Sequence, residues 1–527
     1  MLPLDSAVTT AASSSKNSKT KNKNGKFKMR KFLSSIIFAT LLINSALSAQ
    51  TSESKNSEVT FNVASESDSK TSGWLHENDG KKHWFTAVGG MLFFNVGLAS
   101  YNRFVLGSGW AQVGPDEWNR FWERKMMYDR DWYWTNFVLH PYQGGIYYQV
   151  SRNSNLNQLE SFGVTLLGSA FWEYLCETNA PSTNDMIYTS IGSFAMGEML
   201  YRLSLNADEI SSLLGLAINP MRIWSQAWLR QKPLGTTRNI HELSLKFDVG
   251  TSRAYTEISG YDTSLYDQHE IYPFYFNPSI SLAYNDPYGH DSNDPYSQFE
   301  LSISASVGKG SGSGADCAYK ELDKKMMYDI RIISDGLLIS RAPQLSENTD
   351  TTVALAMEYQ FDWHQFYELS ALGPALAIKQ RVQFDTSKLE WQLHGGWNLL
   401  GTTDYYYYHR TIVEQTANVV RNYNMTCGGL MVLKLRYVTE KGKTLNFGFR
   451  GYAMFDFGRQ LQKDTTCPST GWEWIGDTSL NFEIPVSKLV RIGVGDDLYV
   501  KKAYYKKVPN VFQFLNSGSV YAKLQLK

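Results

Sequence analysis

Cysteine is scarce in this 527-residue chain, and its four copies lie far apart. No pair has CxxC spacing, which argues against a zinc knuckle, although a disulfide between Cys427 and Cys467 is compatible with an oxidising compartment. The sequence also lacks HExxH and ExxH spacings, a GxSxG elbow, a P-loop and a dinucleotide fingerprint. These absences argue against the metalloprotease, serine hydrolase and nucleotide-binding classes that such motifs mark.

Net charge is absent as well, since 51 basic side chains balance 51 acidic ones. The basic ones are concentrated at the start, where residues 1–49 contain eight Lys or Arg and a single acid. The remainder has 43 basic and 50 acidic residues and is therefore net negative. A nucleic-acid partner would need a concentrated basic face, so we expect no nucleic acid to bind.

The first 49 residues contain a short apolar run that is not long enough to span a membrane. It extends from Phe32 to Leu42, follows basic residues and precedes small residues that end at Ala49. This three-part order is typical of a secretory signal peptide, with cleavage near Ala49. No cysteine follows the small residues, which argues against a lipoprotein anchor.

Two further stretches belong to this leader region. Met29 lies just before the signal, so residues 1–28 are interpreted as an upstream extension from a misplaced start codon. Residues 50–80 are rich in Ser, Glu and Lys, and such a composition predicts a disordered leader without a core of its own.

From residue 236 to the end the apolar residues recur with a period of two. In "HELSLKFDV", for example, Leu243, Leu245 and Phe247 lie on one face, and the residues between them are polar or charged. About twelve such segments follow one another, many of them roughly ten residues long, separated by Asn, Asp, Gly and Ser. Alternation of this kind predicts antiparallel strands with one apolar and one polar face.

Two folds are compatible with these strands. A soluble sandwich usually has strands of about five or six residues, whereas a membrane barrel needs about 9–11. The long segments, the aromatic content of 14% and charges such as Lys434, Arg436 and Arg450 on the polar face favour the barrel. We therefore predict an α+β protein with a transmembrane β-barrel of about twelve strands over residues 236–527, in the outer membrane of a Gram-negative cell.

Residues 81–235 lack the alternation and predict a helical domain. Its segments are apolar on most sides but are interrupted by polar residues such as Asn95, Glu173 and Glu198. Small residues recur, including Gly144, Gly168 and Gly197, and such residues let helices approach each other closely.

Carboxylates are dense in this helical region. Glu173 and Glu177 are four residues apart and are expected to share one helix face, where their charges repel. A buried polar network could compensate them, or they could bind a divalent metal or act in catalysis together with His140 and Glu198. Ser182 and Asp185 have the spacing of a helix capping box, and this predicts a structural role for Asp185.

Several short motifs occur in order between residues 80 and 225 and resemble an uncharacterised Gram-negative envelope family known as a domain of unknown function. The resemblance implies an envelope location and no activity. The motif residues are Trp132 or Trp134, Asn136, His140, Pro141, Gly144 or Gly145, Tyr147 or Tyr148, Arg152, Gly168, Ser169, Trp172, Glu173, Tyr174, Glu177, Pro181, Ser182, Asp185, Gly197 and Glu198.

Three functions remain compatible with the sequence. The first is a structural or transport protein whose helical domain plugs the barrel or docks at its periplasmic mouth. The second is an envelope enzyme that modifies lipid or cell-wall material with His140, Glu173, Glu177 and Glu198. The third is an open porin. Outer-membrane lipid is the expected partner in each case, no cofactor is expected apart from a divalent metal in the second, and no protein partner is indicated.

Overall fold

The computed structural model describes most of the chain after residue 74, and these residues belong to one compact unit, Ser72–Lys527. The expected signal peptide, most of the leader, Cys317 and Cys467 lie outside the described residues, and Cys427 is a free thiol. The end of the leader is described, and Asn78 donates to Asn155 at 2.8 Å. The described ranges are 75–129, 131–235, 239–258, 268–313, 326–364, 366–404, 423–456, 470–506 and 510–527.

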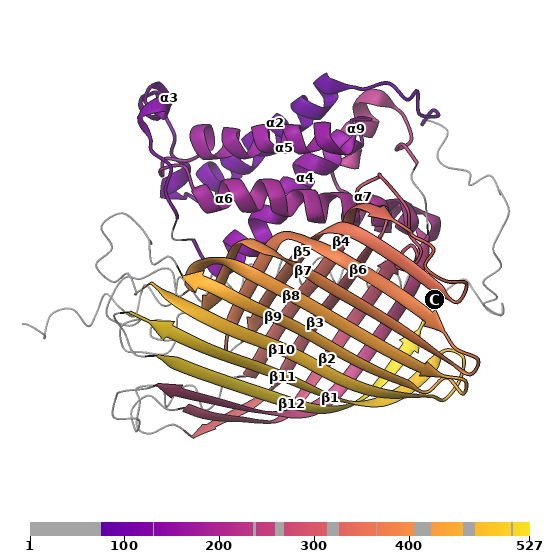
Figure 1. Cartoon of the computed structure of the whole chain (residues 1–527). Coiled ribbons are helices and arrows are strands. Elements are labelled where there is room, and N and C mark those ends of the chain that lie inside the picture. Colours follow the sequence, from indigo (N-terminus) through magenta and orange to yellow (C-terminus); the bar gives the residue numbers. More distant parts are fainter. Residues whose placement is uncertain are drawn as a thin grey trace, which may run out of the picture. The chain divides into compact units, whose positions relative to one another are not determined.

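The C-terminal half is a closed antiparallel barrel of twelve strands, as the alternation predicted (Figure 1). Each strand pairs with its neighbours in sequence, and β1 pairs with β12 to close the sheet, with Leu245 opposite Leu524. Closure leaves no free edge, so backbone groups find partners within the barrel. The strands are β1 Ile240–Ile258, β2 Gln268–Tyr284, β3 Phe299–Ser313, β4 Met326–Arg341, β5 Thr349–His364, β6 Glu368–Gln383, β7 Ser387–Asp404, β8 Tyr423–Thr439, β9 Thr444–Asp456, β10 Gly471–Pro485, β11 Val490–Tyr505 and β12 Val511–Gln525.

The two faces of the barrel wall differ in chemistry. On β5, Glu358 and Asp362 face the lumen, where Glu358 contacts Arg450 of β9 across the barrel at 3.2 Å. The residues that alternate with them, Tyr359 and Phe361, face outward, because successive side chains of a strand point to opposite faces. Over most of the wall these outward residues are apolar and exposed, for example Leu376 and Val494.

The helices precede the barrel in the chain and form a layer of their own. Several include a π-helical stretch, which widens the turn. The main elements are α2 Trp84–Ser100, η1 Tyr101–Val105, α3 Pro115–Asn119, η3 Phe121–Glu123, η4 Thr135–Leu139, α4 His140–Arg152, α5 Gln158–Phe171, η5 Trp172–Cys176, α6 Thr183–Ile187, η6 Tyr188–Gly192, α7 Ser193–Ile210, α8 Ser212–Ile218 and α9 Arg222–Leu229, with a short 3₁₀ turn η2 at Gly109–Ala111. No helix of the described ranges is both long and apolar enough to cross a bilayer by itself.

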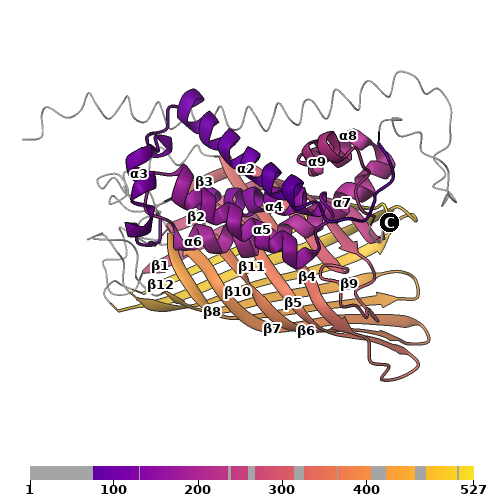
Figure 2. The same ribbon diagram turned by 90° about the horizontal axis from the view of Figure 1, so that it is seen from above.

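The helical layer lies along the outside of the barrel wall, as Figures 1 and 2 show from two directions. The contacts come from outward-facing side chains: Tyr359 donates to the carbonyl of Phe137, and Phe361 stacks on Tyr133 with ring centroids 5.0 Å apart. Tyr188 reaches the wall as well and donates to the carbonyl of Leu400 at 2.8 Å. The expected plug or mouth position is therefore not observed for the described helices.

Side chains of the barrel itself occupy much of the lumen, and the described helices lie outside it. One half holds a buried aromatic layer that includes Tyr272, Tyr367 and Tyr499, with the rings of Tyr367 and Tyr499 stacked 3.8 Å apart. The other half holds ion pairs and a cavity of about 400 Å³ lined by residues such as Glu300 and Lys434.

Candidate functional site

Five of the predicted site residues gather at one end of the helical layer, beside η5 and α6, namely His140, Glu173, Glu177, Ser182 and Asp185. His140 Nε2 lies 3.5 Å from Asp185 Oδ2, and Glu173 Oε2 accepts from the Ser182 N–H at 2.7 Å. Together with Asp129 and Asp131 they form what we call the carboxyl cluster. Glu198 is not part of it.

The expected shared helix face of Glu173 and Glu177 is only partly correct. The helix widens to π geometry over Trp172–Cys176, and Glu177 follows as an extended residue with φ −124° and ψ 145°. The side chain of Glu177 turns back, and its Oε1 accepts from Trp172 Nε1 at 2.7 Å. The sequence spacing assumed a regular α-helix, which ends before Glu177.

Of the two hydrogen bonds of the capping box expected at Ser182, one is present. The Ser182 hydroxyl accepts from the Asp185 N–H at 3.2 Å at the start of α6. The Ser182 N–H, however, donates to Glu173 and not to Asp185. The carboxylate of Asp185 is thereby left to contact Asn184 at 2.8 Å and His140, so a residue predicted to be structural lies inside the candidate site.

Two members of the cluster, Asp129 and Asp131, were missed by the sequence analysis. Asp129 Oδ1 accepts from Asn136 Nδ2 at 2.9 Å and from Asn184 Nδ2 at 2.7 Å, so it joins segments far apart in sequence. Asp131 is exposed and lies at the edge of the cluster. The only signal in the sequence was the pair of acids two residues apart, upstream of the expected helix.

Burial shifts the pKa of Glu173, Glu177, Asp185 and His140. It raises the pKa of Glu173 well above its usual range, and the charge of Glu177 adds to this shift. Burial, followed by the charges of neighbouring acids, raises the pKa of Glu177 to about 8 and that of Asp185 well above its usual range. Burial also lowers the pKa of His140 to about 4. At neutral pH these carboxyls hold protons beside a neutral imidazole, a combination that suits proton transfer.

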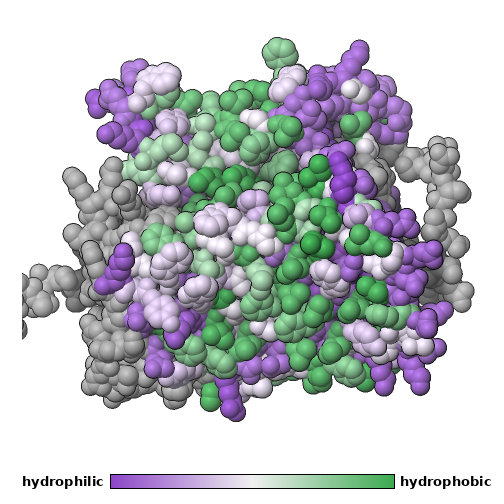
Figure 3. Space-filling view, viewed as in Figure 1, coloured by the Kyte–Doolittle hydropathy of each residue, from purple (hydrophilic) through white to green (hydrophobic). Residues whose placement is uncertain are grey.

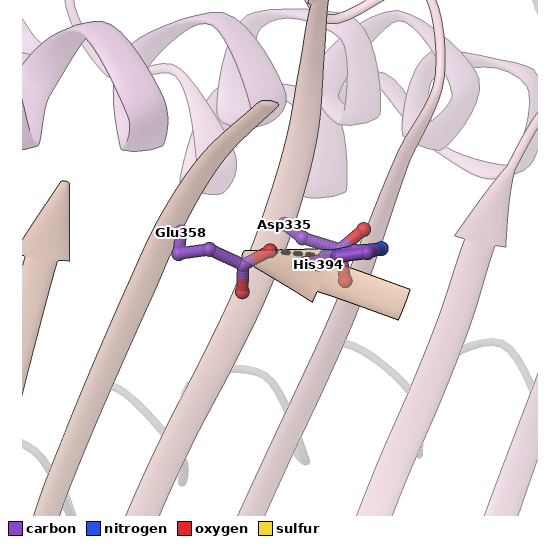
Figure 4. Close-up of side chains that lie close together, drawn as sticks. All are labelled: Asp335, Glu358 and His394. Carbon is purple, nitrogen blue, oxygen red and sulfur yellow. Dashed lines mark hydrogen bonds and ion pairs between the residues drawn. The ribbon is translucent and has the colours of Figure 1, made fainter. Parts of the chain in front are cut away.

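Carboxylate oxygens are ligands that Ca²⁺ and Mg²⁺ prefer, but the cluster is not a preformed metal centre. Among the described residues, one set of His, Cys, Asp or Glu brings its ligand atoms within 4.8 Å of one another, and it is Asp335, Glu358 and His394. Figure 4 shows these side chains pointing toward one another inside the barrel.

The lumen set is already occupied by the chain's own cations. Asp335 contacts Lys379 and Lys434, each at 2.8 Å, and Glu358 contacts Arg450 at 3.2 Å and His394 at 2.5 Å. A metal ion would add positive charge next to three basic side chains. The donor set therefore fits an internal ion-pair network better than a cofactor.

Glu198 belongs to a second internal network, near the opposite end of the helices. It accepts from Arg152 at 2.8 Å and from Arg202 at 2.9 Å, and all three side chains are buried. Arg202 also contacts Asp294 in the β2–β3 connection at 2.7 Å. With both arginines bound to it, Glu198 is held in this network and away from the carboxyl cluster, although the sequence grouped it with His140, Glu173 and Glu177 as a candidate metal ligand or catalytic residue.

Gly144 and Pro141 act through the backbone of the helix that contains His140. A Cβ at Gly144 would lie 1.9 Å from the carbonyl oxygen of Thr189, so α4 and η6 are in close backbone contact. Pro141 lies in the first turn of α4, directly after the π-helical turn Thr135–Leu139. A proline is tolerated at this place because the first N–H groups of a helix have no partner within it.

Comparison with known proteins adds a family match and likenesses of fold. Residues 125–221 match a family described as "Domain of unknown function (DUF3943)", and this range contains the carboxyl cluster. Among curated proteins, none matches the chain in sequence.

Several solved outer-membrane barrels are similar in structure. The transport unit of the autotransporter AIDA-I from Escherichia coli shares 10% identity, with a TM-score of 0.26 over 55% of this chain and 92% of that one. The COG4313 outer membrane channel from Pseudomonas putida F1 shares 9%, with a TM-score of 0.30 over 55% and 97%. The outer membrane protease OmpT from Escherichia coli shares 8%, with a TM-score of 0.23 over 55% and 99%. Likeness at this level concerns the fold and carries no activity with it.

Proposed function

We propose that this protein is an outer-membrane β-barrel that does not conduct solutes and that anchors the helical domain beside its wall. The outward apolar side chains of the strands support a membrane location, because a closed barrel satisfies its backbone hydrogen bonds without water. The structural role follows the first of the three functions that the sequence left open, with the helices outside the barrel.

The filled lumen carries this proposal. Lys379 and Asp335 are essentially inaccessible in one part of the lumen, and Asp362 and Tyr367 in the other. Arg331 bridges Asp362 at 3.1 Å and Asp477 at 3.2 Å across the barrel. An open porin instead has a water-filled channel, so these contacts argue against the third function.

Single-channel recording in planar bilayers tests the proposal. We expect no steady conductance from the folded protein and a new conductance from a Tyr367→Ala/Tyr499→Ala variant, which removes the two stacked rings of the aromatic layer. A gel-mobility shift on boiling shows that each sample contains a folded barrel. Steady current steps from the unsubstituted protein would contradict the closed lumen.

A second function is favoured by one observation, the convergence of His140 and Asp185 with Glu173 and Glu177. Protonated carboxyls beside a neutral imidazole can supply a general acid and a general base for the modification of an envelope lipid. The exposed side chain of Asp131 marks an edge from which a substrate could approach.

Mass spectrometry of envelope lipids tests this enzymatic function. A Glu173→Gln/Glu177→Gln strain is compared with wild type and with a control, Asp116→Asn, whose residue is exposed on α3. An enzymatic role predicts that a lipid species changes in the first strain alone. Identical profiles in all three strains would count against it.

A further inference from the structure

The outer face of the helical layer is apolar over a long distance. Helix α2 contains no charged residue, and its outward side chains include Phe85, Phe93 and Val96, exposed by 97%, 61% and 54%. On α5, Leu159 and Leu167 are exposed by 74% and 61%. Exposing apolar area to water costs about 25 cal/mol per Å², so a face of this kind needs an apolar covering.

Beside an apolar core around Met91 and Val150, the interior of the same layer buries polar and charged side chains, which a water-soluble domain mostly keeps at its surface. Asn95 is fully buried on α2 and donates to the carbonyl of Gly168 at 3.2 Å. The Arg152–Glu198–Arg202 network is buried between α4 and α7. Polar groups inside and apolar groups outside are typical of helices whose surroundings are lipid.

The apolar face continues into the apolar belt of the barrel. The helices run along the barrel wall, and hydrophobic side chains extend from them onto the wall beneath (Figure 3). Helix α2, with 17 residues at about 1.5 Å each, is about 26 Å long, close to the roughly 25 Å height of a barrel's apolar belt. Charged residues flank this stretch, with Lys82 before it and Arg103 after it.

We infer that the outer face of α2 and α5 contacts the acyl chains of the bilayer that surrounds the barrel. The outer face of these two helices then lies in the membrane beside the barrel, whereas α3, with its exposed Asp116, faces water. We infer lipid as the covering of this apolar face because the face is continuous with the apolar belt of the barrel, which also faces lipid. The inference rests on the proposed outer-membrane location.

Site-directed spin labelling in phosphatidylcholine vesicles tests it. Single cysteines replace Phe93, Leu167, Leu376 and Asp116 in a full-length chain whose four native cysteines are changed to Ala. Leu376 reports on the barrel belt, where it is 70% exposed, and Asp116 reports on the exposed helix α3. Power saturation then compares accessibility to oxygen, which enriches in lipid, with accessibility to the water-soluble reagent NiEDDA.

We expect labels at Phe93→Cys and Leu167→Cys to favour oxygen, as the Leu376→Cys label does, and the Asp116→Cys label to favour NiEDDA. If either helical label behaves like the one at Asp116 while the Leu376 label favours oxygen, the inference is overturned and the proposed location stands. If the Leu376 label favours NiEDDA, the membrane location itself fails. Boiling shifts verify folding, and Val96→Cys replaces Phe93→Cys if that variant does not fold.

Discussion

At the scale of single residues, tyrosine hydroxyls join the helices to the barrel by donating to backbone carbonyls. Pro141 has no N–H for the carbonyl of Phe137, four residues earlier, and Tyr359 of β5 donates to this carbonyl at 2.5 Å. The proline thus leaves the carbonyl of Phe137 available as an acceptor for a side chain of the barrel wall. Tyr423 acts similarly and donates to the carbonyl of Asp131 at 2.7 Å.

Tyr359→Phe should destabilise the contact between the Thr135–Arg152 helix and β5 by about 1–3 kcal/mol, because the buried carbonyl of Phe137 loses its hydrogen-bond donor from the barrel. Hydrogen exchange in peptides from Thr135–Arg152 measures the effect and should become faster. Tyr437→Phe, on an exposed outward position of β8, is the control and should leave exchange unchanged. Equal protection in both variants would show that the hydroxyl does not hold the helix.

The protonated carboxyls of the cluster make stability depend on pH. Because the pKa of Glu177 rises from 4.5 to about 8 on folding, the folded protein retains a proton that the unfolded chain releases above pH 4.5. Stability therefore falls as pH rises toward 8. The effect of His140 on the pH dependence of stability has the opposite sign. Because its pKa is lowered on folding, His140 reduces stability only as the pH falls from 6.5 toward 4.

Glu177→Gln should reduce the loss of stability between pH 7.5 and 8, where His140 is almost entirely neutral in the folded and in the unfolded state. The slope should decrease by up to about 1.4 kcal/mol per pH unit, the value for one proton. Urea unfolding in detergent micelles at several pH values, followed by fluorescence, measures it. The control Glu117→Gln, on α3, should keep the wild-type slope above pH 6.5, because the pKa of Glu117 is lowered on folding. If the free energy of unfolding changes with pH as steeply in Glu177→Gln as in wild type, Glu177 is not the group whose raised pKa causes the pH dependence.

At the scale of elements, the strands were predictable because lipid and lumen impose opposite chemistries on alternate side chains. The position of the helices was not, since Tyr359 and Phe361 alternate on β5 in the same way whether lipid or a helix covers them. For the same reason, the candidate site was found only where its signals were local. Glu173 and His140 stood out in the sequence, whereas Asp129 joins them only through tertiary contacts with Asn136 and Asn184.

Close backbone contact between α4 and η6 gives a prediction for two glycines. Gly144→Ala should cost about 1–3 kcal/mol, because its Cβ would overlap the carbonyl oxygen of Thr189. Gly163→Ala on α5 meets nothing within 4 Å and should be neutral or should stabilise by up to about 1 kcal/mol through helix propensity. Thermal melts of the refolded protein compare the two. Similar melting temperatures would contradict the tight packing.

At the scale of the whole molecule, a barrel filled with its own ion pairs leaves only its outer wall for a second domain. The lumen pairs are interdependent, since Lys379 and Lys434 share Asp335 and Glu300. Their contribution to stability should therefore be lost together when one partner is removed.

Lys379→Met should cost about 3–5 kcal/mol, because it keeps the volume but leaves Asp335 and Glu300 with a single nearby ammonium. The temperature at which the compact form converts to the slower-migrating form on gels measures this loss. Lys441→Met, in an exposed turn between β8 and β9, should leave that temperature unchanged. If Lys379→Met melts at the wild-type temperature, water in the lumen must already screen the pair. The aromatic layer, together with the backbone pairing of the twelve strands, would then account for the stability of the closed barrel.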